Sequence, residues 1–153
     1  MSIAKLPGGT RGGRTPPAWL VKLMLPLAIR WHRRSGDQFK GLGVLYLTTV
    51  GARSGEQRTH PVARFGDGED GWVVVASYGG AAKHPGWYHN IVAHPDQVWA
   101  EVDGVKHRVR VEQLEGEARR HAWARVVARA PVFHGYAGKT DRPLPVLQLR
   151  PAG

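Results

Sequence analysis

The sequence contains no cysteine among its 153 residues. It can therefore form no disulfide framework, no thiolate metal site and no covalent intermediate on a cysteine. A Gly-x-Ser-x-Gly nucleophile elbow is also absent, and the few carboxylates stand in turns or at expected helix starts rather than as a facing pair. We therefore do not expect a covalent or carboxylate-driven hydrolase.

Long hydrophobic runs are missing as well. The longest apolar stretch, Trp19 to Ile29, is interrupted by Lys22 and Pro26 and is shorter than the ~20 residues needed to cross a bilayer. The basic residues that follow it form a poor signal-peptide cleavage region. We therefore expect a cytoplasmic protein.

Acidic residues are scarce: the chain has 12 Asp and Glu against 22 Lys and Arg, which gives a formal net charge of +10. Such a balance favours an anionic partner, which can be nucleic acid, an acidic membrane surface or a polyanionic small molecule. The arginines of the expected helix 115–130 point in several directions, and no docking motif accompanies them. We therefore expect no nucleic-acid partner.

Eight histidines raise the question of a metal site. His84, His89 and His94 recur every five residues, a spacing that turns their rings to different sides of a helix. The only literal G-x-G-x-x-G, at 66–71, precedes a strand instead of opening a helix, so it is a hairpin turn and not a dinucleotide site. We predict no metal site and no Rossmann-type site.

The chain divides into a short arm and one domain. Residues 1–15, rich in glycine and basic side chains, predict a flexible basic arm, and 16–150 a single domain. Pro16 and Pro17 stand where prolines open helices, which predicts a helix over 18–34 that Pro26 bends. Its apolar face packs on the body or contacts a membrane, and both alternatives stay open.

Strands dominate the rest of the chain. Apolar and alternating segments predict strands near 44–50, 59–64, 72–77, 98–102, 105–112 and 145–149. Helices are expected over 85–94 and 115–130. The fold class is therefore α+β, mainly β: a small, mostly antiparallel β-barrel with an N-terminal helix and two or three packed helices.

Two segments carry candidate chemistry. The loop 51–58 offers two arginines, a serine hydroxyl and backbone amides that can surround a phosphate or carboxylate, although a basic hairpin loop fits as well. The segment 77–90 follows a buried strand and combines glycines with Trp87 and Tyr88. Glycines let a flat ring approach the backbone; a packed barrel corner is the alternative.

At these segments the sequence resembles the deazaflavin-dependent nitroreductase family, split β-barrel proteins that use the reduced deazaflavin cofactor F420. The resemblance extends from Gly41 to Leu149. It rests on four blocks in the family's order: 47–61 (LTTVGARSGEQRTHP), 75–80 (VASYGG), 84–90 (HPGWYHN) and 140–145 (TDRPLP).

The resemblance implies roles for individual residues. Arg53, Ser54 and Arg58 would hold the phosphate and the start of the oligoglutamate tail, with Lys83 near the same anionic tail. The residues that would line or flank the deazaflavin ring are His60, Pro61, Val62, Val75, Ala76, Ser77 and Tyr78. Gly86, Trp87, Tyr88 and Asn90 would close the site.

The implied reaction is hydride transfer from reduced F420 to a hydrophobic conjugated acceptor. The candidate proton donors are Ser77 and Tyr136, and the acceptor would contact Phe133, Tyr136 and Trp19 of the N-terminal helix. Nitroimidazole-reducing members carry tyrosines where this chain has Ala130 and Phe133. The pocket should therefore be more apolar and poorer in proton donors, which argues against nitroimidazole reduction; the expected acceptor is a quinone, an enone, a lactone or another nitroaromatic compound.

Other functions remain open at this stage. The same barrel could bind FMN as an oxidoreductase, carry F420 without catalysis, or bind nucleic acid through its basic surface. The sequence also leaves open whether the protein is a monomer or a homodimer.

Overall fold

The computed structural model describes residues 2–36, 38–39, 42–68 and 70–152. Met1 of the expected arm, Gly41 at the start of the resemblance and Glu69 of the 66–71 turn lie outside the described residues. The first helix, α1 (Ala18–Arg34), has the predicted bounds and contains Pro26.

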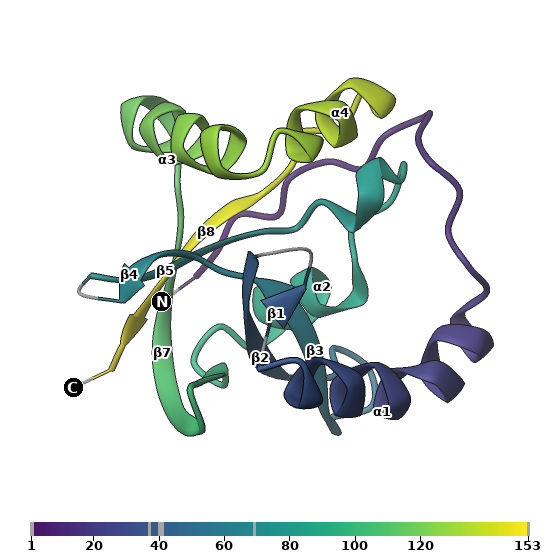
Figure 1. The fold of residues 1–153 in the computed structure, drawn as a ribbon. Helices are drawn as coiled ribbons and strands as arrows, with labels where there is room; N and C mark the ends of the chain where they lie inside the picture. The colour runs from purple at the N-terminus through teal and green to yellow at the C-terminus, as the bar shows by residue number, and fades with distance from the viewer. Residues whose placement is uncertain (1, 37, 40–41, 69, 153) are drawn as a thin grey trace.

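The sheet is antiparallel throughout and is strongly curled (Figure 1). Its strands are β1 (Gln38–Phe39), β2 (Leu42–Val50), β3 (Gln57–Ala63), β4 (Phe65–Gly68), β5 (Gly71–Val75), β6 (Trp99–Val102), β7 (Val105–Gln113) and β8 (Val146–Pro151). They follow the order β1-β2-β6-β7-β8-β5-β4, and β3 pairs with β2. The six predicted strands are confirmed with small shifts, while β1 and β4 were too short to predict.

Local sequence explains these strands. In β7, Val109 and Val111 are buried while Lys106, Arg108 and Arg110 are exposed, the alternation expected of a strand with one wet face. Asp103 and Gly104 both adopt positive φ (51° and 81°), the conformation of the hairpin turn that the Asp-Gly pair predicts.

The hydrophobic core has two parts. One fills the curl of the sheet and includes Leu45, Leu47, Val74 and Leu149. The other lies between the sheet and the last two helices and includes Phe65, Val75, Val126, Phe133 and Val146. The fold is the expected split barrel, with a helical layer over one part of the sheet.

Four further helical segments complete the fold: η1 (Tyr78–Gly80), α2 (Gly86–Ala93), α3 (Gly116–Arg129) and α4 (Val132–Lys139). Pro131 ends α3, as predicted, because proline disfavours the helical conformation of the residue before it. The sequence analysis assigned no element to 132–139, where α4 forms.

The N-terminal segment differs from the free arm that its composition predicts. Residues 2–13, which we call the strap, run extended along the body before the chain reaches α1 (Figure 1). Gly9 N–H donates to Ala82 O at 2.8 Å, Gly13 N–H donates to Gly80 O at 2.9 Å, and Ile3 is buried in the core. The strap is attached along its whole length.

The outer face of α1 is apolar and exposed. Trp19, Leu23, Leu27 and Trp31 are 68%, 65%, 55% and 57% exposed. In the described part of the chain, none of the helices has the length and hydropathy that a bilayer crossing requires.

Candidate cofactor and acceptor site

An apolar pocket opens where the barrel is split. It has a volume of about 470 Å³, and its walls come from β3, the chain after β5, the start of α2 and the α3–α4 junction. Its lining includes Pro61, Val62, Val75, Ser77, Tyr78, Trp87, Ala130, Phe133 and Tyr136. β3 and β5 both contribute residues to this pocket and do not pair with each other.

The turn after β5 is held in an uncommon conformation. Tyr78, Gly79 and Gly80 all have positive φ (45°, 63° and 80°). A Cβ on Gly80 would lie 2.5 Å from the carbonyl oxygen of Tyr136, so only glycine lets this turn meet α4 so closely. The contact places the turn and α4 on facing sides of the apolar pocket.

A second pocket, of about 700 Å³, is basic. Arg53 and Ser54 line it from the β2–β3 loop, Arg58 from the start of β3, His89 and Asn90 from α2, and Lys5 from the strap. Asn90 fixes the loop: its Oδ1 accepts from Ala52 N–H at 3.0 Å, and its Nδ2 donates to Thr49 Oγ1 at 3.1 Å. This pocket can take a phosphate or carboxylate.

The two pockets are neighbours along β3 and the start of α2, and we refer to the pair as the groove. Arg58 in the basic pocket and Val62 in the apolar pocket lie on the same face of β3, with His60 between them. At the start of α2, Gly86 lines the basic pocket while Pro85 and Trp87 line the apolar one. A ligand with a flat ring and an anionic tail fits this layout.

His60 provides a test of that fit. Its Nδ1 is buried and has no hydrogen-bond partner among the described residues. Burial, and next the charge of Arg58, lower the pKa of His60, so the ring is neutral at neutral pH. A buried polar atom without a partner is costly, and a hydroxyl-bearing chain between ring and phosphate would satisfy it.

A buried arginine supports the apolar pocket from behind. Arg142, only 4% exposed, donates to the carbonyl oxygens of Ala76 (3.1 Å), Ser77 (2.7 Å) and Ala81 (2.7 Å). Its Nη1 also lies 3.0 Å from His84 Nδ1. The guanidinium therefore fixes the backbone that leads into the turn at Tyr78.

His84 links this arginine to the strap. Its Nε2 lies 2.9 Å from Leu6 O and 3.1 Å from Pro7 O, so Nε2 carries the proton and Nδ1 accepts from Arg142. Burial, opposed by the Leu6 hydrogen bond and aided by the Arg142 charge, lowers the pKa of His84. The neutral ring joins strap, α2 and pocket wall.

Most of the predicted site residues meet in this groove. The apolar pocket contains Pro61, Val62, Val75, Ser77, Tyr78, Trp87, Phe133 and Tyr136, and the basic pocket contains Arg53, Ser54, Arg58, Gly86 and Asn90. His60 lies between the two.

Four predicted site residues lie elsewhere. Ala76 is fully buried in the core, and only its carbonyl takes part, as an Arg142 acceptor. Tyr88 is also buried; its hydroxyl donates to Gln113 Oε1 and accepts from Leu6 N–H, so it secures the strap. Lys83 is exposed and lines neither pocket. Trp19 lies on the exposed face of α1 and lines neither pocket.

Sequence reasoning missed Val132 in the apolar pocket and Lys5 in the basic pocket. The spacing of Val132, Phe133, Tyr136 and Ala137 is a helical pattern that could have revealed α4. Lys5 gave no such signal, because its neighbours resemble a free arm.

Comparisons with known proteins agree with this geometry. The family model described as F420H(2)-dependent quinone reductase matches residues 27–151. An F420H(2)-dependent quinone reductase of Mycobacterium tuberculosis is 35% identical over 108 residues, which cover 69% of this chain and 71% of the relative. A putative F420H(2)-dependent quinone reductase of the same species is 30% identical over 112 residues, covering 73% and 92%.

Solved structures show the same relationship. An F420-H2 dependent reductase, FDR-A, superimposes with a TM-score of 0.63 at 36% identity, covering 70% of this chain and 93% of that one. A domain-swapped dimer gives 0.63 at 31% identity, covering 80% and 99%. A haem storage protein from Vibrio cholerae shares the fold alone, with a TM-score of 0.54 and 15% identity over 84% of this chain and 91% of that one.

Proposed function

The chain belongs to the F420H(2)-dependent quinone reductase family, and from this premise we propose that it reduces a quinone bound in the apolar pocket. It is an F420H2-dependent oxidoreductase, as its sequence resemblance implied. The observation that supports the proposal best is the pairing of an apolar pocket with a basic pocket along one strand, with the unpaired Nδ1 of His60 on the same strand between Arg58 and Val62.

The proposal gives each group of residues in the groove a task. Arg53, Ser54 and Arg58 would hold the phosphate and the first carboxylates of F420, and His60 Nδ1 would bond to the hydroxyl chain. Val62, Val75 and the turn at Tyr78 would flank the ring. The bound cofactor supplies a hydride, and the chain contributes position and orientation.

The apolar pocket suits a quinone as acceptor. Ala130, Val132 and Phe133 offer apolar contact on the side opposite β3, and Phe133 packs edge-on against Phe65 and Tyr136 with ring centroids 5.5 and 5.3 Å apart. Tyr136 and Ser77 bring hydroxyls into the same pocket. Either hydroxyl can donate the proton that a reduced quinone requires.

Binding and turnover test the proposal together. Fluorescence titration with oxidised F420 should give saturable binding, and FMN at equal concentration should not compete. Reduced F420 should then be oxidised on addition of a water-soluble naphthoquinone, at a rate that saturates with quinone. Binding of FMN in preference to F420, or F420 binding without quinone reduction, would contradict the proposal.

The exposed face of α1 supports a further part of the proposal, a peripheral contact on the cytoplasmic side of an anionic membrane. Trp19, Leu23 and Leu27 share this face with Arg30 and Arg34, so apolar and cationic groups point the same way. Such a helix lies at the boundary between headgroups and acyl chains, where long-chain quinones reside.

Flotation with vesicles tests this contact. The double variant Trp19→Ser, Leu23→Ser should lose binding to vesicles that contain anionic lipid while still reducing the soluble naphthoquinone. Val105→Ser, which removes an exposed apolar side chain from the β6–β7 hairpin, is the matched control. Equal flotation of all three proteins would rule out α1 as the contact.

A further inference from the structure

The strap lies outside the part of the chain that the family model matches, which begins at residue 27. Its roles therefore have to be derived from its own contacts. It passes the pocket wall closely: a side chain at Gly12 would collide with the backbone of Ala81 and Ala82, and one at Gly9 would approach Asp141 Oδ1 to 2.6 Å. The strap is fitted to this surface.

Several side chains of the body hold the strap. Asp141 accepts from Thr10 N–H at 2.8 Å, from the Thr10 hydroxyl at 2.5 Å and from Arg11 N–H at 3.2 Å. These hydrogen bonds lower the pKa of Asp141 to about 2, so the carboxylate stays charged and bound across the neutral range. The strap is thus secured at its C-terminal half.

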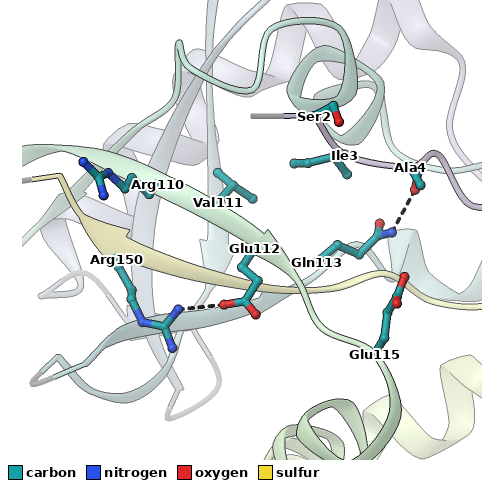
Figure 2. Close-up of a pocket in the computed structure, with 9 residues that line it drawn as sticks. All are labelled: Ser2, Ile3, Ala4, Arg110, Val111, Glu112, Gln113, Glu115 and Arg150. Atoms are coloured by element: carbon teal, nitrogen blue, oxygen red, sulfur yellow. Dashed lines mark hydrogen bonds and ion pairs between the residues drawn. The ribbon is translucent and has the colours of Figure 1, made fainter.

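The N-terminal half is secured on both sides of Lys5. Gln113 Nε2 donates to Ala4 O at 2.8 Å, and Figure 2 shows Ser2, Ile3 and Ala4 lying beside β7 with this bond drawn. On the other side, Leu6 N–H donates to Tyr88 Oη at 3.0 Å, and His84 Nε2 donates to Leu6 O. The backbone of Lys5 is therefore fixed between two anchored residues.

The cavity drawn in Figure 2 is not itself a site. It encloses about 570 Å³ between the start of the strap and β7, but its Arg150 and Glu112 pair with each other at 2.7 Å. Lys5 is not among its lining residues and lines the basic pocket instead.

Lys5 adds a cation to the basic pocket, and it lies outside the four sequence blocks (47–61, 75–80, 84–90 and 140–145) that carry the family resemblance. Lys5 and His89 line this pocket together, and after burial the charge of Lys5 is the next cause that lowers the pKa of His89. Across the described residues, no carboxylate forms an ion pair with Lys5, whereas Arg58 already pairs with Glu56 at 3.1 Å. Its charge is available to an anion.

We propose that Lys5, carried by the strap, is a binding residue for the anionic tail of the deazaflavin cofactor. The inference rests on the proposed function for the identity of that ligand. Lys5 is the strap's contribution to the lining of the basic pocket, where it would bind the phosphate or glutamate carboxylates together with Arg53 and Arg58. Tail binding then depends on a segment that the barrel does not supply.

Cofactor forms that differ only in the tail test this role. The ligands are oxidised F420 and its riboside, which has the same ring but neither phosphate nor glutamates. The variants are Lys5→Ala, Lys5→Arg and the control Lys22→Ala, which removes an exposed lysine on α1 that lines no described pocket. Dissociation constants are measured by fluorescence at low salt and at 0.5 M salt.

We expect Lys5→Ala to weaken F420 binding about five-fold at low salt, the scale of a partly exposed ion pair. Lys5→Arg should restore the affinity, and high salt should shrink the difference. Binding of the riboside should be the same in all variants. These results together would establish Lys5 as a tail ligand.

Two outcomes would overturn the inference. In the first, Lys5→Ala binds F420 as tightly as the control Lys22→Ala does, which would mean that the Lys5 ammonium takes no part in binding. Equal weakening of F420 and riboside would mean that the substitution disturbs the groove as a whole. Quinone reduction by the wild-type protein is assayed separately. If the wild-type protein reduces no quinone, but Lys5→Ala weakens binding of F420 and not of the riboside, the quinone reductase proposal is rejected and this inference stands.

Discussion

The two ends of the groove share β3 and the start of α2 but differ in the rest of their walls. The apolar end is built by elements that pack, namely β3, the turn after β5 and the α3–α4 junction. The basic end is built by a loop, the first turns of α2 and the strap. A ligand bound at both ends can lie in only one direction, so the contrast fixes its orientation before any specific contact is considered.

This contrast implies that ring binding and tail binding are separable. Substitutions at the basic end should change affinity for the complete cofactor and not for its riboside. Substitutions behind the apolar end should change both. Variants at each end, measured with both ligands, test this division.

Removing both arginines of the basic end should have the largest effect. Arg53→Ala with Arg58→Ala deletes two charged hydrogen-bond donors, and we expect F420 affinity to fall about 100-fold or more. Riboside affinity should not change. The control is Arg120→Ala with Arg125→Ala, two exposed arginines of α3. An equal loss of riboside binding in fluorescence titration would break the division.

Removing the support behind the apolar end should affect stability and both ligands. Arg142→Ala leaves the carbonyl oxygens of Ala76, Ser77 and Ala81 without their donor. We expect the free energy of unfolding in urea to fall by about 3 kcal/mol, with weaker binding of F420 and riboside alike. Arg150→Ala, which removes only an exposed ion pair, should cost under ~1 kcal/mol. Similar losses in the two variants would show that Arg142 is not a support.

A substitution on the acceptor side of the apolar end should lower the rate of quinone reduction without changing F420 binding. Tyr136→Phe keeps the ring that packs on Phe133 but removes the hydroxyl. We expect kcat for quinone reduction to fall about ten-fold, less than for an essential general acid because water can also donate the proton. The F420 dissociation constant should not change. A decrease in Ser77→Ala instead would assign the proton to Ser77.

The smallest expected effect is on pH dependence. The pKa values of His60 and His84 are lowered in the folded protein, so below pH 6.5 the unfolded chain binds more protons. The two neutral histidines therefore contribute their full share of the free energy of unfolding above that pH, and this contribution is lost as the pH falls below it. We expect a lower Tm at pH 5.5 than at pH 7.5, and a smaller difference in His84→Gln. A higher Tm at pH 5.5 would contradict this sign.

The sequence predicted the barrel well because its signals are local. Alternation in β7, the Asp103-Gly104 turn and Pro131 after α3 each act within a few residues, and all three appear in the structure as expected. The 51–58 and 77–90 segments were predicted to lie beside an anion and a flat ring; the structure brings both segments to the groove, and their ligands stay a prediction.

What the sequence did not predict depends on distant contacts. Nothing near Lys5 indicates that Gln113, Tyr88 and His84 hold its neighbours in place. Tyr88 and Trp87 are adjacent aromatic residues, yet one secures the strap and the other lines the apolar pocket. Only the direction in which α2 turns them decides which role each takes.

The open side of β3 has a consequence for self-association. Among the described strands β3 pairs only with β2, so its other edge presents backbone groups to which a strand of a second chain could add. Pro61 stands near the middle of β3 and has no N–H to donate, which interrupts any regular ladder there. The unpaired edge of β3 is thereby a poor template for strand-by-strand aggregation.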